Sequence, residues 1–337
     1  MEKNTFDQIC AELRKKPKRW LVTGVAGFIG SHLLEKLLEL GQSVEGLDNF
    51  SEGYQKNIDE VLFMEKSRNG TFRMMEGDLR DTALCRQACE DVDIILHQGA
   101  LGSVPRSILD PLATHGSNVD GFINILTAAK EAGIKRFVYA SSSSVYGDAP
   151  DLPMVEDKRG SLLSPYALSK WINEEYADLY SRLYGMECLG LRYFNVFGPR
   201  QDPNGAYAAV IPRWFSAIKN NDPVVIYGDG ETSRDFCFIN DVVQANLLAA
   251  TTTNTDAYGQ AFNVACEEAT TLNELFTVIR DLVCPGSDLQ PAYEPFRPGD
   301  IRYSLADVEK ARCLLDYNPK IGITEGLVGT APWYLSN

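Results

Sequence analysis

Tyr166 and Lys170 are the residues in this chain whose types and spacing first suggest chemistry. They form Y-x-x-x-K within "SPYALSKWINEE", and on a helix this i, i+4 spacing points both side chains to one face. A phenol, with a pKa of about 10, is a poor base at neutral pH, but a nearby ammonium favours the phenolate by charge attraction. The pair could therefore remove a proton from a substrate hydroxyl. Taken alone, the same spacing is typical of a solvated helix face.

A serine run lies upstream of this pair, in "YASSSSVYG" at residues 139–147. The run ends a strand-like segment, where the catalytic groups of parallel α/β sheets collect. A serine hydroxyl close to the phenol could orient a substrate and relay its proton. The serines therefore predict a site at this strand end rather than a flexible linker.

A glycine-rich turn near the N-terminus indicates a bound dinucleotide. "LVTGVAGFIG" places Gly24, Gly27 and Gly30 between a strand and a helix, and Asp48 ends the next strand. Such glycines permit a tight turn and close backbone approach, while the free N–H groups of the helix N-terminus face a pyrophosphate. Asp48 is expected to accept hydrogen bonds from the adenosine ribose and to repel a 2′-phosphate, so the sequence favours NAD over NADP.

Alternating strand and helix patterns must position these groups. Strand-like runs at 19–24, 43–48, 71–78, 92–100, 135–142 and 187–195 alternate with helical stretches at 28–41, 118–133 and 164–185. This rhythm predicts an α/β fold, a Rossmann-type doubly wound parallel sheet with helices on both faces. Beyond residue 195 the rhythm loosens. We therefore expect an NAD-binding domain at 1–195 and a smaller α/β substrate lobe at 196–337, and segments of the two can interleave.

Composition narrows the classes of partner. The net charge of −14 argues against nonspecific binding to nucleic acid or to an anionic membrane surface. No apolar run reaches the length of a membrane-spanning helix, and "MEKNTFDQIC" lacks a signal-peptide core, so a cytoplasmic location is expected. The three histidines make a His-rich metal site improbable, and the eight scattered cysteines are typical of reduced thiols.

The G-x-x-G-x-x-G spacing and the Y-x-x-x-K pair together resemble the short-chain dehydrogenase/reductase superfamily. "GDLRD" and "HQGA" fit as well: the superfamily places an acid like Asp78 by the adenine, and His97 is expected to be structural. Counting back from Tyr146 puts the superfamily's catalytic serine at Ser142. The resemblance implies these cofactor-binding residues: Gly24, Gly27, Phe28, Ile29, Gly30, Asp48, Asn49, Asp78, Leu79, Gln98, Ala100, Ser117, Tyr166, Lys170, Tyr193 and Val196.

Further segments resemble the extended members that act on nucleotide sugars, above all UDP-hexose 4-epimerases. These are "RYFNVFGPRQ", "GDGETSRDF" and "FRPGD". Guanidinium groups suit a diphosphate, and a carboxylate suits a ribose diol. The resemblance implies these substrate-binding residues: Ser103, Ser142, Ser143, Asn195, Ala209, Val210, Trp214, Tyr227, Arg234, Arg297, Asp300 and Ser304. Trp214 and Tyr227 could equally pack in a core, and Ala209 departs from the asparagine of galactose-type members.

Three positions refine the expected activity. Ser143 and Ser144 stand where related 4,6-dehydratases carry Asp-Glu, so the chain lacks evident machinery for dehydration. Ser304 stands where a large tyrosine restricts relatives to glucose and galactose, so a small residue implies room for a 2-acetamido group.

The resemblance therefore implies a UDP-GlcNAc/UDP-GalNAc 4-epimerase of bacterial surface polysaccharide (O-antigen) synthesis, working through a transient 4-keto sugar. It also implies a homodimer. The open alternatives are a UDP-glucose/galactose or UDP-uronic acid 4-epimerase, and a non-catalytic NAD-binding scaffold.

Overall fold

A parallel β-sheet organises the protein. The computed structural model describes residues 5–205, 208–296 and 301–336. Within them seven strands form one sheet in the order β11-β6-β5-β4-β1-β2-β3, and each neighbouring pair is parallel. The strands are β1 (Arg19–Thr23), β2 (Ser43–Asp48), β3 (Thr71–Glu76), β4 (Ile94–His97), β5 (Arg136–Ser142), β6 (Glu187–Tyr193) and β11 (Gln260–Val264). This topology confirms the predicted Rossmann-type fold.

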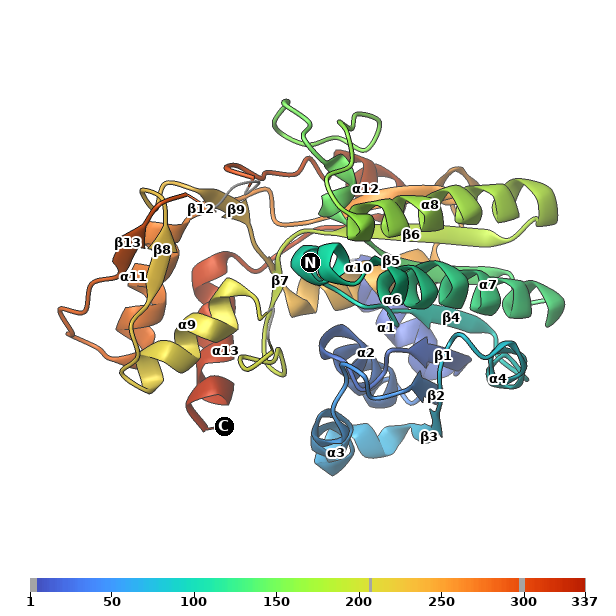
Figure 1. Ribbon diagram of the computed structural model, residues 1–337. Helices are drawn as coiled ribbons and strands as arrows, with labels where there is room; N and C mark the ends of the chain where they lie inside the picture. Colours follow the sequence, from blue (N-terminus) through green and yellow to red (C-terminus); the bar gives the residue numbers. More distant parts are fainter. Residues whose placement is uncertain (1–4, 206–207, 297–300, 337) are drawn as a thin grey trace.

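Helices cover both faces of this sheet, as Figure 1 shows. Along β1, Trp20 and Val22 join one apolar core and Leu21 joins the other, because successive strand side chains point to opposite faces. The first core packs against α1 (Thr5–Lys15), α2 (Phe28–Glu39) and α10 (Ile239–Thr251). The second packs against α4 (Thr82–Ala88), α7 (Gly121–Glu131) and α8 (Pro165–Tyr184).

A second group of elements lies beside the sheet, at the left of Figure 1. It contains α9 (Val210–Lys219), α11 (Leu272–Val283) and α13 (Ile323–Ser336) with the strand pair β8 (Val225–Tyr227) and β13 (Ala292–Glu294). Aromatic contacts hold the helices together: the rings of Trp214 and Phe276 are 6.0 Å apart, and those of Phe215 and Tyr334 are 4.9 Å apart. Trp214 is thus a packing residue of this group as well as a predicted pocket wall.

Two connections join this group to the sheet. β11, which follows α10, pairs with β6 at the edge of the main sheet. Met154 forms a bridge with Ala306, and α12 (Glu309–Leu315) then packs on β11. β9 (Ser233–Asp235) also pairs with β12 (Ala269–Thr271), and β10 (Cys237–Phe238) with β7 (Val196–Phe197). Residues 196–337 therefore build both parts of the molecule.

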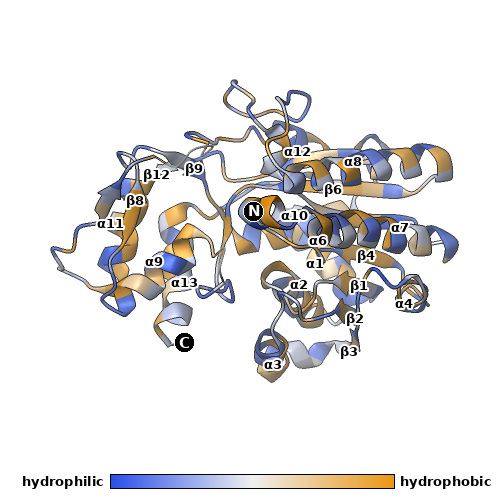
Figure 2. Cartoon of the chain, viewed as in Figure 1, coloured by the Kyte–Doolittle hydropathy of each residue, from blue (hydrophilic) through white to orange (hydrophobic). Residues whose placement is uncertain are grey.

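Local signals set the ends of α8, the helix that carries Tyr166 and Lys170. The Ser164 side chain accepts a hydrogen bond from the Ala167 amide, and Pro165 occupies the first turn. Gly185 ends the helix in the left-handed conformation. Figure 2 shows hydrophilic and hydrophobic residues mixed along α8. The shorter helices are α3 (Gln55–Phe63), α5 (Val104–Leu109) and α6 (Pro111–His115).

Candidate active site

The glycine turn between β1 and α2 has the shape of a phosphate cradle. Gly24 has a φ of +68°, and a Cβ there would lie 2.7 Å from the Gly99 nitrogen. A Cβ at Gly30 would overlap the Gly24 carbonyl. Gly27, the N-cap of α2, has no side chain to cover the first amide groups of the helix. The backbone here can therefore approach a pyrophosphate closely.

Asp48 lies at the end of β2, beside this cradle. Its Oδ2 accepts a hydrogen bond from the Ala26 amide at 2.9 Å, and its Oδ1 accepts one from the Phe50 amide at 2.8 Å. Burial raises the pKa of this carboxyl, and the backbone hydrogen bonds oppose that rise. Each oxygen can still accept a further bond, so the geometry suits a ribose diol.

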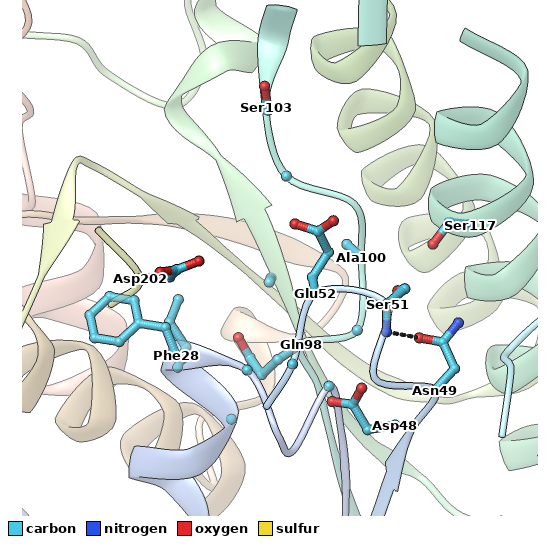
Figure 3. Close-up of a pocket in the computed structure, with 18 of the residues that line it drawn as sticks. Phe28, Asp48, Asn49, Ser51, Glu52, Gln98, Ala100, Ser103, Ser117 and Asp202 are labelled. Carbon is cyan, nitrogen blue, oxygen red and sulfur yellow. Dashed lines mark hydrogen bonds between the residues drawn. The ribbon is translucent and has the colours of Figure 1, made fainter. Parts of the chain in front are cut away.

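A cavity of about 630 Å³ extends from the glycine turn to Tyr166 and Lys170, and Figure 3 shows Phe28, Asp48, Gln98, Ser103 and Ser117 around it. Each residue predicted to bind the cofactor lines this first cavity, apart from Val196. Predicted cofactor residues in its wall are Gly24, Gly27, Phe28, Ile29, Gly30, Asp48, Asn49, Asp78, Leu79, Gln98, Ala100, Ser117, Tyr166, Lys170 and Tyr193. The residues present therefore fit a dinucleotide such as NAD.

Tyr166 and Lys170 face the end of β5. The Lys170 Nζ donates a hydrogen bond of 2.8 Å to the Ala140 carbonyl, and its side chain is buried. Burial lowers the pKa of Lys170 to about 8, against the attraction of Glu174. Burial raises the pKa of Tyr166, and a hydrogen bond with the Ser142 side chain opposes that rise. The arrangement provides a phenol, a hydroxyl and an ammonium at one strand end.

The serines of the run make different contacts. The Ser142 Oγ accepts a hydrogen bond of 3.2 Å from the Ser144 amide and also meets Tyr166. The Ser141 Oγ donates a bond of 2.5 Å to Glu174 on α8, and Ser141 lines the first cavity. Ser142 and Ser143 are not among the residues that line either cavity described here. The predicted substrate contact of Ser143 stays a prediction.

Two side-chain pairs line the first cavity. Glu52, in the loop after β2, pairs with Arg106 at 2.6 Å. The Tyr54 hydroxyl donates a bond of 2.6 Å to Asp202. Figure 3 shows Glu52 and Asp202 at the cavity. None of these four residues was predicted from the sequence, because the partners in each pair are far apart in the chain. The only local signal is the polar loop "NFSEGY" after Asp48.

A second cavity, of about 460 Å³, adjoins the first, since Gln201, Ala208 and Ala209 line both. Arg234 projects from β9 into this region, where its Nη1 donates to the Ser233 carbonyl at 2.9 Å. Arg302, another residue that we did not predict, pairs with Asp229 at 2.5 Å. Predicted residues that line the second cavity are Asn195, Val196, Ala209, Val210, Trp214, Tyr227 and Arg234.

The remaining predicted substrate residues lie elsewhere. Ser103 lines the first cavity, while Arg297 and Asp300 lie outside the described residues. Ser304 is buried beside β9, where its amide donates to the Ser233 carbonyl at 3.2 Å. Ser103 and Asn195 have φ values of 110° and 33°. Strained backbone of this kind collects at functional sites, so these two positions fit the predicted substrate contacts.

His97 is a structural residue at the end of β4. Its Nδ1 lies 2.8 Å from the Thr23 Oγ1, and its ring stacks on Phe137. Burial lowers its pKa to about 3, so the ring is neutral. Within the described residues no cluster of three His, Cys, Asp or Glu side chains could hold a metal ion, and no helix is long and apolar enough to cross a bilayer.

Known proteins share this arrangement. The model of the NAD dependent epimerase/dehydratase family matches residues 20–265. The chain belongs to this family. Since the match covers the glycine turn, the serine run and the Tyr-Lys pair, the chain is an enzyme of the family and its cofactor is NAD.

The most similar relatives include UDP-sugar 4-epimerases. A UDP-glucose 4-epimerase of Mycolicibacterium smegmatis is 37% identical over 318 residues, which is 94% of this chain and 98% of the relative. A UDP-N-acetylglucosamine 4-epimerase from Methanobrevibacter ruminantium, solved with UDP-N-acetylmuramic acid, is 39% identical with a TM-score of 0.87, over 95% and 99% of the two chains. A Thermus thermophilus UDP-glucose 4-epimerase solved with NAD is 32% identical with a TM-score of 0.81, over 94% and 98%.

Proposed function

We propose that this enzyme interconverts UDP-GlcNAc and UDP-GalNAc by inverting C4. The observation that carries the sugar choice is Ser304. This small residue is buried beside β9, and its hydroxyl is without a hydrogen-bond partner among the described residues. The family resemblance implies that a large tyrosine at this position restricts 4-epimerases to glucose and galactose, so the small serine supports a site with room for a 2-acetamido group. A relative that is named for UDP-N-acetylglucosamine supports the same choice.

Side chains on β5 and α8 have separate roles in the proton transfer. Tyr166 takes the proton of the 4-hydroxyl, Ser142 orients that hydroxyl, and the Lys170 ammonium stabilises the phenolate. NAD, when bound, supplies reversible oxidation at C4. Arg234 in the second cavity anchors the diphosphate by charge-assisted hydrogen bonds. The 4-keto sugar turns over while the UDP stays anchored, so that C4 regains its hydrogen on the opposite face and Tyr166 returns the proton to the 4-oxygen. The cycle therefore ends without net oxidation.

Ser143 and Ser144 support epimerisation over dehydration. A dehydratase needs an acid and a base beside C5 and C6, and neither serine supplies a carboxylate. The Ser144 Oγ is buried and lacks a hydrogen-bond partner among the described residues. We infer that the oxidised sugar is returned to the hydroxyl form rather than losing water. In the cell, the product would serve surface polysaccharide synthesis from the cytoplasm.

Incubation of the purified enzyme with UDP-Glc, UDP-Gal, UDP-GlcNAc, UDP-GalNAc and UDP-glucuronate, with separation of the products, tests the proposal. We expect the highest kcat/KM for the acetylated pair. A preference for UDP-Glc and UDP-Gal or for the uronate would contradict the sugar choice. Release of a 4-keto-6-deoxy sugar would contradict the reaction type.

We also propose that the enzyme is a homodimer joined through α8 and the neighbouring α5 and α6. These helices pack together and expose large apolar side chains. The exposed residues are Ile108, Leu109, Leu112, Leu168, Leu183 and Tyr184. An apolar surface of this kind is typical of an interface between subunits.

A further inference from the structure

Three successive turns of α8 are tied to three consecutive residues of β5. Tyr166 hydrogen-bonds the Ser142 side chain, and Lys170 donates to the Ala140 carbonyl at 2.8 Å. One turn further on, Glu174 accepts a bond of 2.5 Å from Ser141. The i, i+4, i+8 spacing puts Tyr166, Lys170 and Glu174 on one helix face. The first two do the proton chemistry described above, which leaves the third without an assigned task.

Glu174 is held by a buried ion pair. Its two oxygens accept bonds of 2.9 and 2.8 Å from Arg192 on β6, and the side chains are 8% and 4% exposed. Arg192 pairs with Ser141 across β5 and β6, so both partners of the carboxylate come from one rung of the sheet. Arg192 also donates to the Glu156 carbonyl at 3.0 Å and lies over the Tyr146 ring. The carboxylate is therefore fixed in place.

The charge of Glu174 acts on Lys170. A buried ammonium loses its proton easily, and burial is what lowers the pKa of Lys170 to about 8. Among the residues that the structure describes, Glu174 is the one charged group that opposes this effect. We propose that Glu174 is a positioning residue of the epimerase: it keeps Lys170 protonated and in place beside Tyr166, while Arg192 and Ser141 hold Glu174. The proposal rests on the roles of Tyr166 and Lys170 given above.

Other charged groups face this cluster and must be considered. His97 on β4 lies near Lys170, but its pKa of about 3 keeps the ring neutral. Burial raises the pKa of Tyr139 on β5 well above the usual range, and the negative charge of Glu174 adds to that rise. Lys310 on α12 also feels Glu174, and burial lowers its pKa. Lys310 is therefore a group that could titrate beside Glu174 and Arg192, and a Lys310→Met background checks for its contribution.

The test separates support of Lys170 from mere neutralisation of Arg192. In Glu174→Gln we expect the alkaline fall of kcat to begin about one pH unit lower, because Lys170 loses its proton sooner, with kcat reduced about fivefold at pH 8. The double variant Glu174→Gln/Arg192→Met removes both charges and should regain thermal stability. The alkaline fall of kcat in the double variant should nevertheless remain at the lower pH. Glu174→Asp keeps the negative charge, so its alkaline fall of kcat should return toward the wild-type pH.

The matched control is Glu175→Gln, which removes an exposed acid next along the same helix and should leave the pH profile unchanged. If the double variant behaves like the wild type, Glu174 only neutralises Arg192 and the proposal is wrong. Each comparison uses whichever UDP-sugar the wild type converts fastest, so the sugar choice does not affect it. A pH titration of the NAD-loaded enzyme tests the proposal without turnover. The absorbance of the Tyr166 phenolate is measured as the difference from Tyr166→Phe. The phenolate should appear at higher pH in Glu174→Gln, and an unchanged titration would overturn the proposal.

Discussion

The Lys170 Nζ lies 2.8 Å from the carbonyl oxygen of Ala140, two residues before the serine that hydrogen-bonds Tyr166. This bond fixes the start of α8 against the end of β5. It also fills one hydrogen-bonding position of the ammonium and leaves the others for the cofactor ribose. The proton-transfer group and its cation are therefore placed by one strand.

Tyr166→Phe removes the group that takes the substrate proton. We expect kcat to fall by about 10²- to 10⁴-fold, while the fold and NAD binding are retained because the ring still fills its site. Turnover of the preferred UDP-sugar and NAD content after gel filtration check this. Glu175→Gln, at an exposed position on the same helix, is the control. Full activity of Tyr166→Phe would refute the assignment.

Glu52→Gln breaks the ion pair with Arg106 in the wall of the first cavity. The Glu52 side chain is half exposed, so the ion pair with Arg106 contributes at most about 1 kcal/mol, and we expect NAD to dissociate about threefold faster. Addition of Tyr54→Phe should increase the effect. Stopped-flow displacement of NAD measures the rate. Glu131→Gln, which breaks an exposed pair with Arg86, should leave the rate unchanged, and equal rates in all variants would contradict the prediction.

Ser304→Tyr fills the space that we assign to the acetamido group. We expect kcat/KM for UDP-GlcNAc to fall by at least about tenfold relative to that for UDP-Glc, because the larger ring must occupy a buried position. Ser304→Ala, which keeps the space, should retain the wild-type preference. NAD content and the melting temperature show whether each variant is folded, since overpacking costs about 1–3 kcal/mol. An unchanged ratio in a folded Ser304→Tyr enzyme would remove the basis of the sugar choice.

Asp235 ties together three chain segments, since its carboxylate accepts hydrogen bonds from the amides of Cys266, Glu267 and Ala306. Burial raises its pKa to about 6 from a usual 3.8. The stability from this group is therefore complete below pH 4 and is lost as the pH rises through 6. Asp235→Asn replaces one carboxylate oxygen with an NH2 group, which cannot accept hydrogen bonds from these amides. The substitution should therefore lower the free energy of unfolding by about 1–3 kcal/mol at pH 7.

The destabilisation by Asp235→Asn should be larger at pH 4 than at pH 7, because only the wild type gains stability on protonation. Urea unfolding at several pH values measures both curves. Asp222→Asn, at an exposed position, should change the free energy of unfolding by less than about 0.5 kcal/mol. A constant difference between Asp235→Asn and the wild type would show that this carboxyl does not titrate between pH 4 and 7.

Leu183→Glu places a charge on the apolar surface of α8. Light scattering should give about twice the chain mass of 37.4 kDa for the wild type and a larger monomer fraction for the variant, because burial of an unpaired charge is costly. Leu62→Glu, at an exposed position on α3, should leave the mass unchanged. A monomeric wild type would contradict the proposed dimer.

Much of the fold followed from local patterns, because each long helix and buried strand carries its own periodicity. The glycine turn predicted the cradle at Gly24 and Gly27, and nearly every predicted cofactor residue lines one cavity. Two short helices, α5 and α6, were missed because five or six residues show too little periodicity to identify a helix.

Other features depend on contacts between distant residues. Glu52 meets Arg106, and Tyr54 meets Asp202, yet none of these residues carries a local pattern that names its partner. The same holds for Ser141, to which the sequence assigned no partner. Its partner Glu174 lies on the helix face shared with Lys170, and that relation became visible only when β5, β6 and α8 were placed together.

The edge position of β11 has a consequence for synthesis in the cell. The ribosome delivers the chain from the N-terminus, and β6 is released well before β11, which pairs with it. Until Gln260–Val264 emerge, one side of β6 offers unpaired backbone groups to other chains. Nascent chains are therefore exposed to edge-to-edge association during the interval in which α9 and α10 are translated. A chaperone that shields β6 at that stage should raise the yield of folded enzyme.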